Sequence, residues 1–361
     1  MKRVTIQDIA KEMGLSRNTV AKALSNGNVS PETRQAVVQK ACQMGYAKLD
    51  DALVEEVMHQ KRKTGGGTIL VLFNRWQSLF WNTTLAGISD GAKQEGYRMQ
   101  LYIVNEDDLD GEEVLEQLED DVQGIIFLCI FPIRFVKGIA RAGLPMTFFN
   151  TPVDAQEYIA LGDVYNLEGF YSMNRLTGYC IDVKKCTSFA FIGFAEGSRV
   201  VQARLLGFMS ACRKRGIEPD QKMLFTHPSN DVYYGYSMVE EAIDQMPYMP
   251  DAIICENDDI AKYTATVLLR KNPALAERTI ITGFDHTIEE DFFKKDILTV
   301  DVRIEALGRR LVKSVVDRIK NPVHKLNSII ILKFISLFFS KLHILHAHPN
   351  RVNNFHCLIV C

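Results

Sequence analysis

Residues 5–25 read TIQDIAKEMGLSRNTVAKALS, and their spacing predicts two short helices joined by a tight turn. Thr5 stands three residues before Asp8, as in a capping box, so we expect Thr5 to cap the first helix. Gly14 can adopt the left-handed backbone that ends a helix. The apolar positions of the first helix recur at the spacing of a single face and are Ile6, Ile9, Ala10 and Met13.

The second predicted helix has an exposed polar face. Its apolar positions are Val20, Ala23 and Leu24, and Ser16 offers its N-cap. Arg17, Asn18 and Lys22 point away from that apolar face. Arg can donate two hydrogen bonds to guanine, and Asn can pair in the same way with adenine. The pattern matches a helix-turn-helix that places its second helix in the major groove. On spacing alone, an amphipathic helical hairpin with a solvated polar face is an equal alternative.

Residues 4–46, VTIQDIAKEMGLSRNTVAKALSNGNVSPETRQAVVQKACQMGY, resemble the DNA-binding domain of the LacI/GalR family of bacterial repressors. The matching features are T-I-x-D-I-A, G-x-S-x-x-T-V-x-x-x-L-S/N and V-S-x-x-T-R, each in the expected position. The resemblance implies a homodimer that binds a palindromic site in double-stranded operator DNA. The DNA-contacting residues that we expect are Thr5, Ser16, Arg17, Asn18, Thr19, Lys22 and Asn26.

Composition is consistent with a nucleic-acid-binding head on a separate body. The chain has 361 residues and a net charge of −2, but residues 1–48 hold eight Lys or Arg against three Asp or Glu, a net of +5 that leaves −7 for the rest. Eight scattered cysteines without a CxxC pair favour reduced thiols. No apolar stretch follows Lys2 and Arg3, so we expect no signal peptide and a cytoplasmic location.

Short apolar runs alternate with helical patterns from residue 68 onward. Four runs before residue 151 and four after residue 187 predict buried parallel strands, for example TILVLF at 68–73 and AIICE at 252–256. The two similar halves predict an α/β fold with two doubly wound parallel-sheet subdomains and a cleft between them, preceded by the small all-α head. This region resembles the periplasmic-binding-protein-like effector domain of the same family.

Four segments carry the second resemblance, and they imply the residues of an effector site. They are residues 73–97, SRVVQARLLGF at 198–208, AIICENDDIA at 252–261 and ITGFDHT at 281–287. The residues at the family's ligand-contacting positions are Trp81, Arg204, Asn257 and Asp285, with Asn166 as a weaker candidate because Tyr165 replaces the expected Asp before it. These residue types suit a polyhydroxylated ligand, so we expect a carbohydrate. For each residue a structural role is the alternative.

The domain boundaries follow from these patterns. We expect a DNA-binding domain at 1–48, a hinge helix and linker at 49–67, an effector-binding and dimerisation domain at 68–335, and an atypical tail at 336–361. The hinge departs from the family, because it lacks the usual Pro-Asn step and carries four carboxylates. Since carboxylates repel DNA phosphates, a dimer-contact helix is at least as plausible as one that enters the minor groove.

The tail from Ser336 has no counterpart in the family. A metal site formed by His343, His346, His348, His356 and Cys357 is one interpretation, and a non-native end that adds nothing to the fold is the other. We favour the non-native end, because no metal-ligand spacing repeats, and expect no metal. The apolar run at 328–339 is too short to span a membrane.

Together these features predict a transcriptional regulator, a repressor whose operator binding is controlled by a small-molecule effector. No catalytic motif such as G-x-S-x-G, a Walker A loop or H-E-x-x-H occurs, so we expect neither enzymatic activity nor a cofactor. A solute-binding protein for transport and a sugar-modifying enzyme are the two competing functions. The helix-turn-helix argues against the first, and the absence of a catalytic set argues against the second.

Overall fold

The computed structural model describes residues 4–25, 27–46, 48–49, 66–74, 78–105, 107–226, 235–288, 297–321, 327–332 and 336–338. The chain divides into two units, residues 1–67 and residues 68–361. We call them the head and the body. The predicted hinge helix at 49–67 lies almost entirely outside the described residues.

The head contains three helices around a small apolar core. They are α1 Ile6–Met13, α2 Arg17–Leu24 and α3 Pro31–Gln43. The capping box predicted for α1 is confirmed, since Thr5 N donates to Asp8 Oδ2 at 2.9 Å and Asp8 N donates to Thr5 Oγ1 at 3.3 Å. Gly14 ends α1 with φ 65°. The buried residues that pack together in the core of the head are Ile9, Ala10, Val20, Ala23, Val37 and Ala41.

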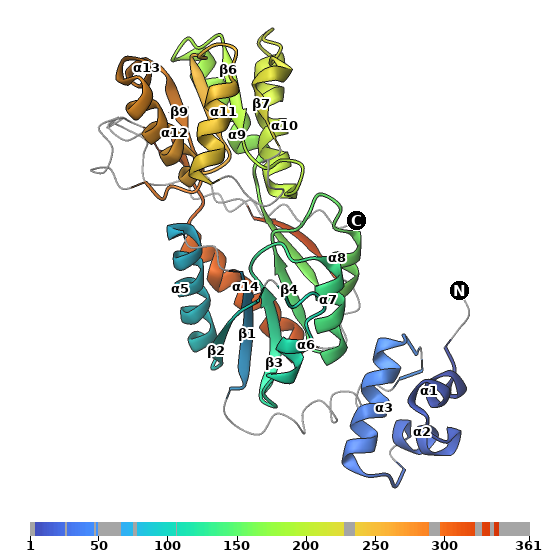
Figure 1. Cartoon of the computed structure of the whole chain (residues 1–361). Coiled ribbons are helices and arrows are strands. Elements are labelled where there is room, and N and C mark those ends of the chain that lie inside the picture. The colour runs from blue at the N-terminus through green and yellow to red at the C-terminus, as the bar shows by residue number, and fades with distance from the viewer. Residues whose placement is uncertain are drawn as a thin grey trace, which may run out of the picture. The chain divides into compact units, whose positions relative to one another are not determined.

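The first lobe of the body is a six-stranded parallel sheet in the order β11-β5-β4-β3-β1-β2. Helices α5 and α14 lie on one side of the sheet, and α6, α7 and α8 lie on the other (Figure 1). The strands are β1 Thr68–Phe73, β2 Arg98–Ile103, β3 Val122–Phe127, β4 Met146–Phe149, β5 Asp163–Leu167 and β11 Ile329–Leu332. The helices are α5 Leu79–Gln94, α6 Glu112–Glu116, α7 Ile133–Ile139, α8 Gln156–Leu161 and α14 Ile304–Lys320, with a 3₁₀ turn η1 at Ala140–Ala142.

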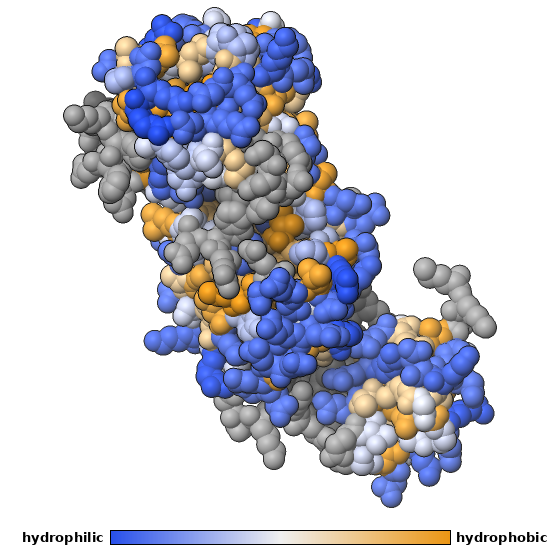
Figure 2. Space-filling view, viewed as in Figure 1, coloured by the Kyte–Doolittle hydropathy of each residue, from blue (hydrophilic) through white to orange (hydrophobic). Residues whose placement is uncertain are grey.

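The second lobe is a smaller parallel sheet in the order β7-β6-β8-β9. Its strands are β6 Phe189–Ile192, β7 Leu224–Phe225, β8 Ala252–Cys255 and β9 Ile280–Thr282. Its helices are α9 Phe170–Asp182, α10 Arg199–Arg213, α11 Tyr236–Gln245, α12 Asp258–Lys271 and α13 Pro273–Arg278, with a 3₁₀ turn η2 at Gln221–Met223. On the face in Figure 2, hydrophilic residues cover much of this lobe, and hydrophobic residues reach the surface near the level where the lobes meet.

Helices α5 and α14 approach each other closely because glycines line their contact. A Cβ on Gly87 would lie 2.5 Å from the carbonyl oxygen of Glu305, and a Cβ on Gly308 would lie 2.4 Å from that of Thr84. Neither position has room for a larger residue without a backbone shift. This pair ties the start of the body to its last helix, so segments more than 200 residues apart form one lobe.

The tail adds more to the fold than we expected. Ser336–Phe338 form strand β12, which pairs antiparallel with β10, Thr299–Asp301. The expectation that residues from Ser336 add nothing is therefore wrong for these three residues, because β10 offers them an unpaired edge. Residues 339–361, including the candidate metal ligands, lie outside the described part of the chain.

Candidate functional site

The head presents the second helix of its helix-turn-helix with polar side chains outward. Arg17, Asn18 and Lys22 are exposed, while Val20 and Ala23 are buried in the core. Helix α2 carries two cations and no carboxylate, so its outer face can approach phosphates without repulsion.

The turn before α2 fixes the direction of that helix. Ser16 caps it, because Ser16 Oγ accepts from Thr19 N at 3.0 Å and lies 2.8 Å from Thr19 Oγ1. Both hydroxyls are therefore engaged locally, as is that of Thr5, which donates to Asp8 Oδ2 at 2.7 Å. Asn26, the remaining predicted DNA contact, lies outside the described residues.

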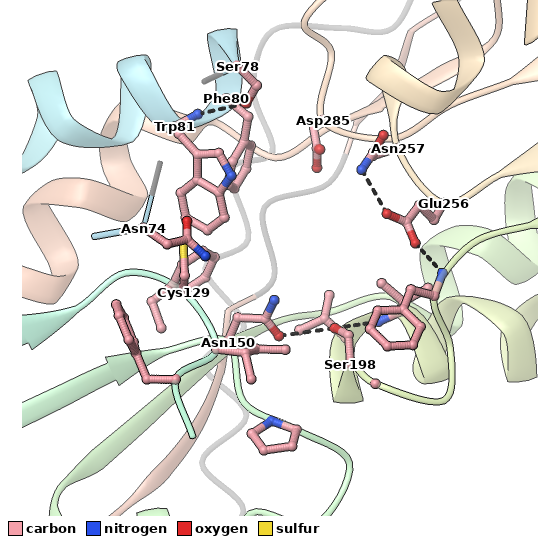
Figure 3. A pocket seen from close by; sticks show the side chains of 18 of the residues that line it. Asn74, Ser78, Phe80, Trp81, Cys129, Asn150, Ser198, Glu256, Asn257 and Asp285 are labelled. Atoms are coloured by element: carbon pink, nitrogen blue, oxygen red, sulfur yellow. Dashed lines mark hydrogen bonds between the residues drawn. The ribbon is translucent and has the colours of Figure 1, made fainter. Parts of the chain in front are cut away.

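A cavity of about 530 Å³ lies between the two lobes of the body. Its wall is formed by the ends of strands and the starts of helices, where open α/β sheets bind ligands. Three helices begin at this cavity, and their N-cap residues line it: Ser78 for α5, Ser198 for α10 and Asn257 for α12. Figure 3 shows Trp81 on one side of the cavity, with Glu256, Asn257 and Asp285 opposite.

Arg204, on α10, lines the second-lobe side of the cavity. Its guanidinium carbon sits 3.8 Å from the centre of the Phe284 ring, and Nη1 donates to the carbonyl oxygen of Glu256 at 2.6 Å. Nη2 lies 3.5 Å from Asp285 Oδ1. The Nε–H has no hydrogen-bond partner among the described residues, although the side chain is almost fully buried. A buried donor without a partner carries a free-energy cost, which the cation–π contact with Phe284 and the bond to Glu256 offset in part.

Asp285 is held in an unusual backbone conformation. Its φ is 106° and that of His286 is 56°, both in the left-handed region that non-glycine residues rarely adopt. Such strain is often concentrated at binding sites. Burial raises the pKa of Asp285 well above its usual value of 3.8, Arg204 offsets part of that rise, and the carboxylates of Asp258, Asp259 and Glu256 add to it.

Glu256 and Asn257 follow β8 and join the cavity wall to the start of α12. Asn257 Oδ1 accepts from Ile260 N at 2.9 Å, so Asn257 caps the helix, and its Nδ2 donates to Glu256 Oε1 at 3.0 Å. Glu256 Oε2 accepts from Phe194 N at 2.6 Å. These bonds hold a buried carboxylate against the cavity.

Aromatic rings dominate the first-lobe wall. Trp81 contacts Phe80 and Phe149, with ring centres 4.9 and 5.8 Å apart. Tyr158 adds a ring whose hydroxyl donates to Phe131 O at 2.6 Å, and burial raises the pKa of that hydroxyl to about 12. This wall offers flat apolar faces, which suit the C–H face of a sugar.

Two further groups line the first-lobe side. Cys129 Sγ donates to Asn74 Oδ1 at 3.0 Å, and burial raises the pKa of the Cys129 thiol. Asn150 has φ 66°, and its Oδ1 accepts from Ser198 Oγ at 3.2 Å across the lobes. These residues contribute polar atoms to a wall that is otherwise apolar.

Comparison with known proteins identifies both parts of the chain. Residues 5–48 match the family described as "Bacterial regulatory proteins, lacI family", and residues 182–335 match "Periplasmic binding protein-like domain". The chain combines a lacI-family DNA-binding domain with a periplasmic-binding-protein-like domain. It is a DNA-binding transcriptional regulator and not an enzyme.

Relatives along almost the whole length support this assignment. The "Probable HTH-type transcriptional repressor ExuR" of Bacillus subtilis is 23% identical over 330 residues, covering 91% of this chain and 95% of the relative. The "HTH-type transcriptional regulator CelR" of Thermobifida fusca is 23% identical over 335 residues, covering 88% and 92%.

Solved structures of lacI-family proteins share the fold. A CelR–cellobiose complex has a TM-score of 0.63 at 18% identity and covers 93% of this chain and 98% of its own. The lac repressor dimer bound to operator and the anti-inducer ONPF has a TM-score of 0.58 at 17% identity, with the same coverage.

In the described parts of the chain, no helix combines the length and apolar character needed to span a bilayer.

The structure brings together four of the five effector residues that the sequence predicts for the body. Trp81, Arg204, Asn257 and Asp285 all line the cavity. Asn166 does not: it lies inside β5, paired with β11, and is buried in the first lobe. The prediction missed Glu256, whose position directly after a buried strand was a signal in the sequence. It also missed Asn150, whose place in the wall depends on the approach of the second lobe.

Proposed function

We propose that this chain is a repressor whose affinity for a palindromic operator is controlled by a sugar bound between the lobes of the body. Arg17 and Asn18 would contact base edges, and Lys22 a base or a phosphate, with Thr5, Ser16, Thr19 and Asn26 contacting the DNA backbone or nearby bases. The relatives named above are repressors and regulators, and the lac repressor structure contains a dimer on its operator. We propose the same homodimeric assembly here, in the cytoplasm.

The observation that carries the proposal is the cavity, which pairs an aromatic wall with a hydrogen-bonding wall. Trp81 offers a flat face, the Arg204 guanidinium offers N–H donors, and Asp285 offers carboxyl oxygens to ligand hydroxyls. A ligand that contacts both lobes would stabilise one relative arrangement of the lobes over another. A small molecule shifts such a conformational equilibrium by the difference in its affinity for the two arrangements. The bound cellobiose of the CelR structure supports a carbohydrate as the class.

A thermal-shift screen of the full chain against sugars tests the effector assignment. A ligand present at about 100 times its Kd stabilises the native state by about 2.7 kcal/mol, which is several degrees in Tm for a domain of this size. We expect at least one sugar to give such a shift, and Trp81→Ala and Arg204→Ala to abolish it. A shift that survives in both variants would place the sugar elsewhere.

A further inference from the structure

Two consecutive residues at the edge of the cavity, Asp285 and His286, have a left-handed backbone, with φ 106° and 56°. Neither is a glycine, and such a conformation persists only where the surrounding structure fixes it. Asp285 lines the cavity, and its Oδ1 lies 3.5 Å from Nη2 of Arg204. The groups that hold the 283–287 segment therefore also determine where the Asp285 carboxyl group lies.

Strand β10 holds the first part of this segment. Asp285 N donates to the carbonyl oxygen of Val300 at 2.8 Å. His286 N donates to Thr299 Oγ1 at 3.2 Å. Because a backbone N–H lies in the plane of its peptide bond, these two bonds orient the peptide planes before and after Asp285.

Asp258, the first residue of α12, holds the rest of the segment. Its Oδ2 accepts from Thr287 N at 2.6 Å and from Thr287 Oγ1 at 3.3 Å. Its Oδ1 accepts from Thr299 Oγ1 at 2.6 Å, and that same hydroxyl accepts from His286 N. The Asp258 carboxyl group is therefore bonded to one N–H of the segment directly and to a second through Thr299.

The backbone of the segment also packs against this carboxyl group. A Cβ on Gly283 would lie 2.1 Å from Asp258 Oδ1, so a larger residue there would displace the carboxyl group. Asp258 N donates to the carbonyl oxygen of Phe284 at 2.9 Å. Asp258 is fully buried behind the cavity wall, so a ligand in the cavity would contact Asp285 and not Asp258.

We infer that Asp258 is a positioning residue, which fixes the left-handed backbone at Asp285 and thereby the affinity of the cavity for its ligand. This inference rests on the proposed function, which assigns Asp285 to the ligand. The alternative is that Asp258 only stabilises the start of α12. Asn257 already caps that helix, and the bonds from Thr287 and Thr299 to Asp258 come from outside it.

Hydrogen–deuterium exchange of the full chain without ligand tests the positioning at pH 7.5. The readout is the exchange rate of the peptide that covers residues 283–288. Asp258→Ala should raise that rate at least about tenfold, because a buried N–H, that of Thr287, loses its acceptor. Asp258→Asn keeps an oxygen for Thr287 N and has an amide that can donate to Thr299 Oγ1, so it should restore most of the protection.

Asp251→Ala is the matched control, because Asp251 makes the same kinds of bond at the opposite end of β8. Asp251 Oδ2 accepts from Thr187 N at 2.8 Å, from Thr187 Oγ1 at 2.9 Å and from Ser188 N at 3.0 Å. This variant should raise exchange at residues 187–188 and leave that at residues 283–288 unchanged.

A second variant provides the test if Asp258→Ala does not fold. Thr299→Val keeps the size of the side chain and removes the hydroxyl that joins His286 N to Asp258. It should also raise exchange at residues 283–288. Unchanged exchange there in the folded variants would overturn the inference.

Isothermal titration tests whether the position of Asp285 sets the affinity. The probes are glucose, galactose, xylose, ribose, cellobiose and maltose. For a sugar that binds the wild type, Asp258→Ala should weaken binding at least about tenfold, and Asp258→Asn should recover most of that loss. The double variant Asp258→Ala/Asp285→Ala should bind no more weakly than Asp285→Ala alone, because Asp258 acts through Asp285.

The outcomes separate this inference from the proposed function. Additive losses in the double variant, or equal losses in Asp258→Ala and Asp251→Ala, would overturn the positioning role and leave the sugar-controlled repressor standing. If none of the sugars binds the wild type, the carbohydrate class is contradicted, and the exchange rates alone decide whether Asp258 holds the 283–287 segment.

Discussion

Arg204 and Asp285 face each other in the wall of the cavity, with Nη2 and Oδ1 3.5 Å apart. That distance exceeds the 2.7–2.9 Å typical of a charge-assisted hydrogen bond, so the two groups are associated loosely. Both are almost fully buried, and burial raises the pKa of Asp285 well above its usual value, although Arg204 opposes part of that rise. A ligand that bonds to both would therefore complete an arrangement that the protein leaves incomplete.

Arg17→Ala should weaken binding to the selected operator by roughly 1–3 kcal/mol and relax the preference at one base pair in each half-site. The reason is that Arg17 is exposed at the start of α2, where a recognition helix contacts bases. Sequence selection from random DNA provides the measurement. Lys11→Ala, which removes a cation from α1, should lower affinity for all sequences alike. An identical selected motif for Arg17→Ala would contradict the assignment.

Gly308→Ala should lower the free energy of unfolding by about 1–3 kcal/mol, because the new Cβ meets the Thr84 carbonyl oxygen at 2.4 Å in the α5–α14 contact. Chemical denaturation of the full chain measures the change. Gly235→Ala is the control, since a Cβ there would lie 3.7 Å from its nearest neighbour. Equal effects of the two substitutions would show that the close helix approach does not limit stability.

Because of Asp258, the free energy of unfolding should fall as the pH rises from about 4 to 6. Its folded pKa is raised to about 6 from 3.8, so the unfolded chain loses its proton first. The contribution of Asp258 is present below about pH 4 and is lost by about pH 6, a change of about 3 kcal/mol. The unfolding free energy of the wild type minus that of Asp258→Asn should fall by this order across the interval. A difference that is constant or rises with pH would be incompatible with a buried, protonated Asp258.

Two truncated chains should distinguish the contribution of β12 to the melting temperature from that of the residues after it. A chain ending at Phe338 keeps the β10–β12 pairing and should melt at the temperature of the full chain. A chain ending at residue 335 loses that pairing, and its Tm should fall by a few degrees. If removal of 339–361 alone lowers Tm, or if the purified full chain retains stoichiometric zinc after dialysis, the residues beyond Phe338 have a structural role.

The head could be predicted from the sequence because its determinants are local. The Thr5–Asp8 capping box, the Gly14 turn and the Ser16 cap each depend on residues within four positions of one another. The apolar spacing then fixes which faces meet. Helix α14 is also recognisable from its sequence, because it is long and strongly amphipathic.

The short helices and strands of the body were harder to predict from the sequence. Helices α6, α7 and α8 have five to seven residues, too few for a clear periodic pattern, and β7 has two residues. In the cavity, the family motifs predicted Arg204 and Asp285. The place of Asn150 depends on a contact between lobes that no local pattern records.

Operator binding by the wild type and Arg204→Ala, each with and without the sugar identified by thermal shift, tests the central claim most directly. Fluorescence anisotropy with the selected palindromic DNA gives the four Kd values. We predict that the sugar changes the wild-type Kd by at least about tenfold, a coupling of about 1.4 kcal/mol, and leaves that of Arg204→Ala unchanged, while the two proteins bind equally without sugar. An equal sugar effect in both proteins, or no sugar effect in either, would contradict effector control through this cavity.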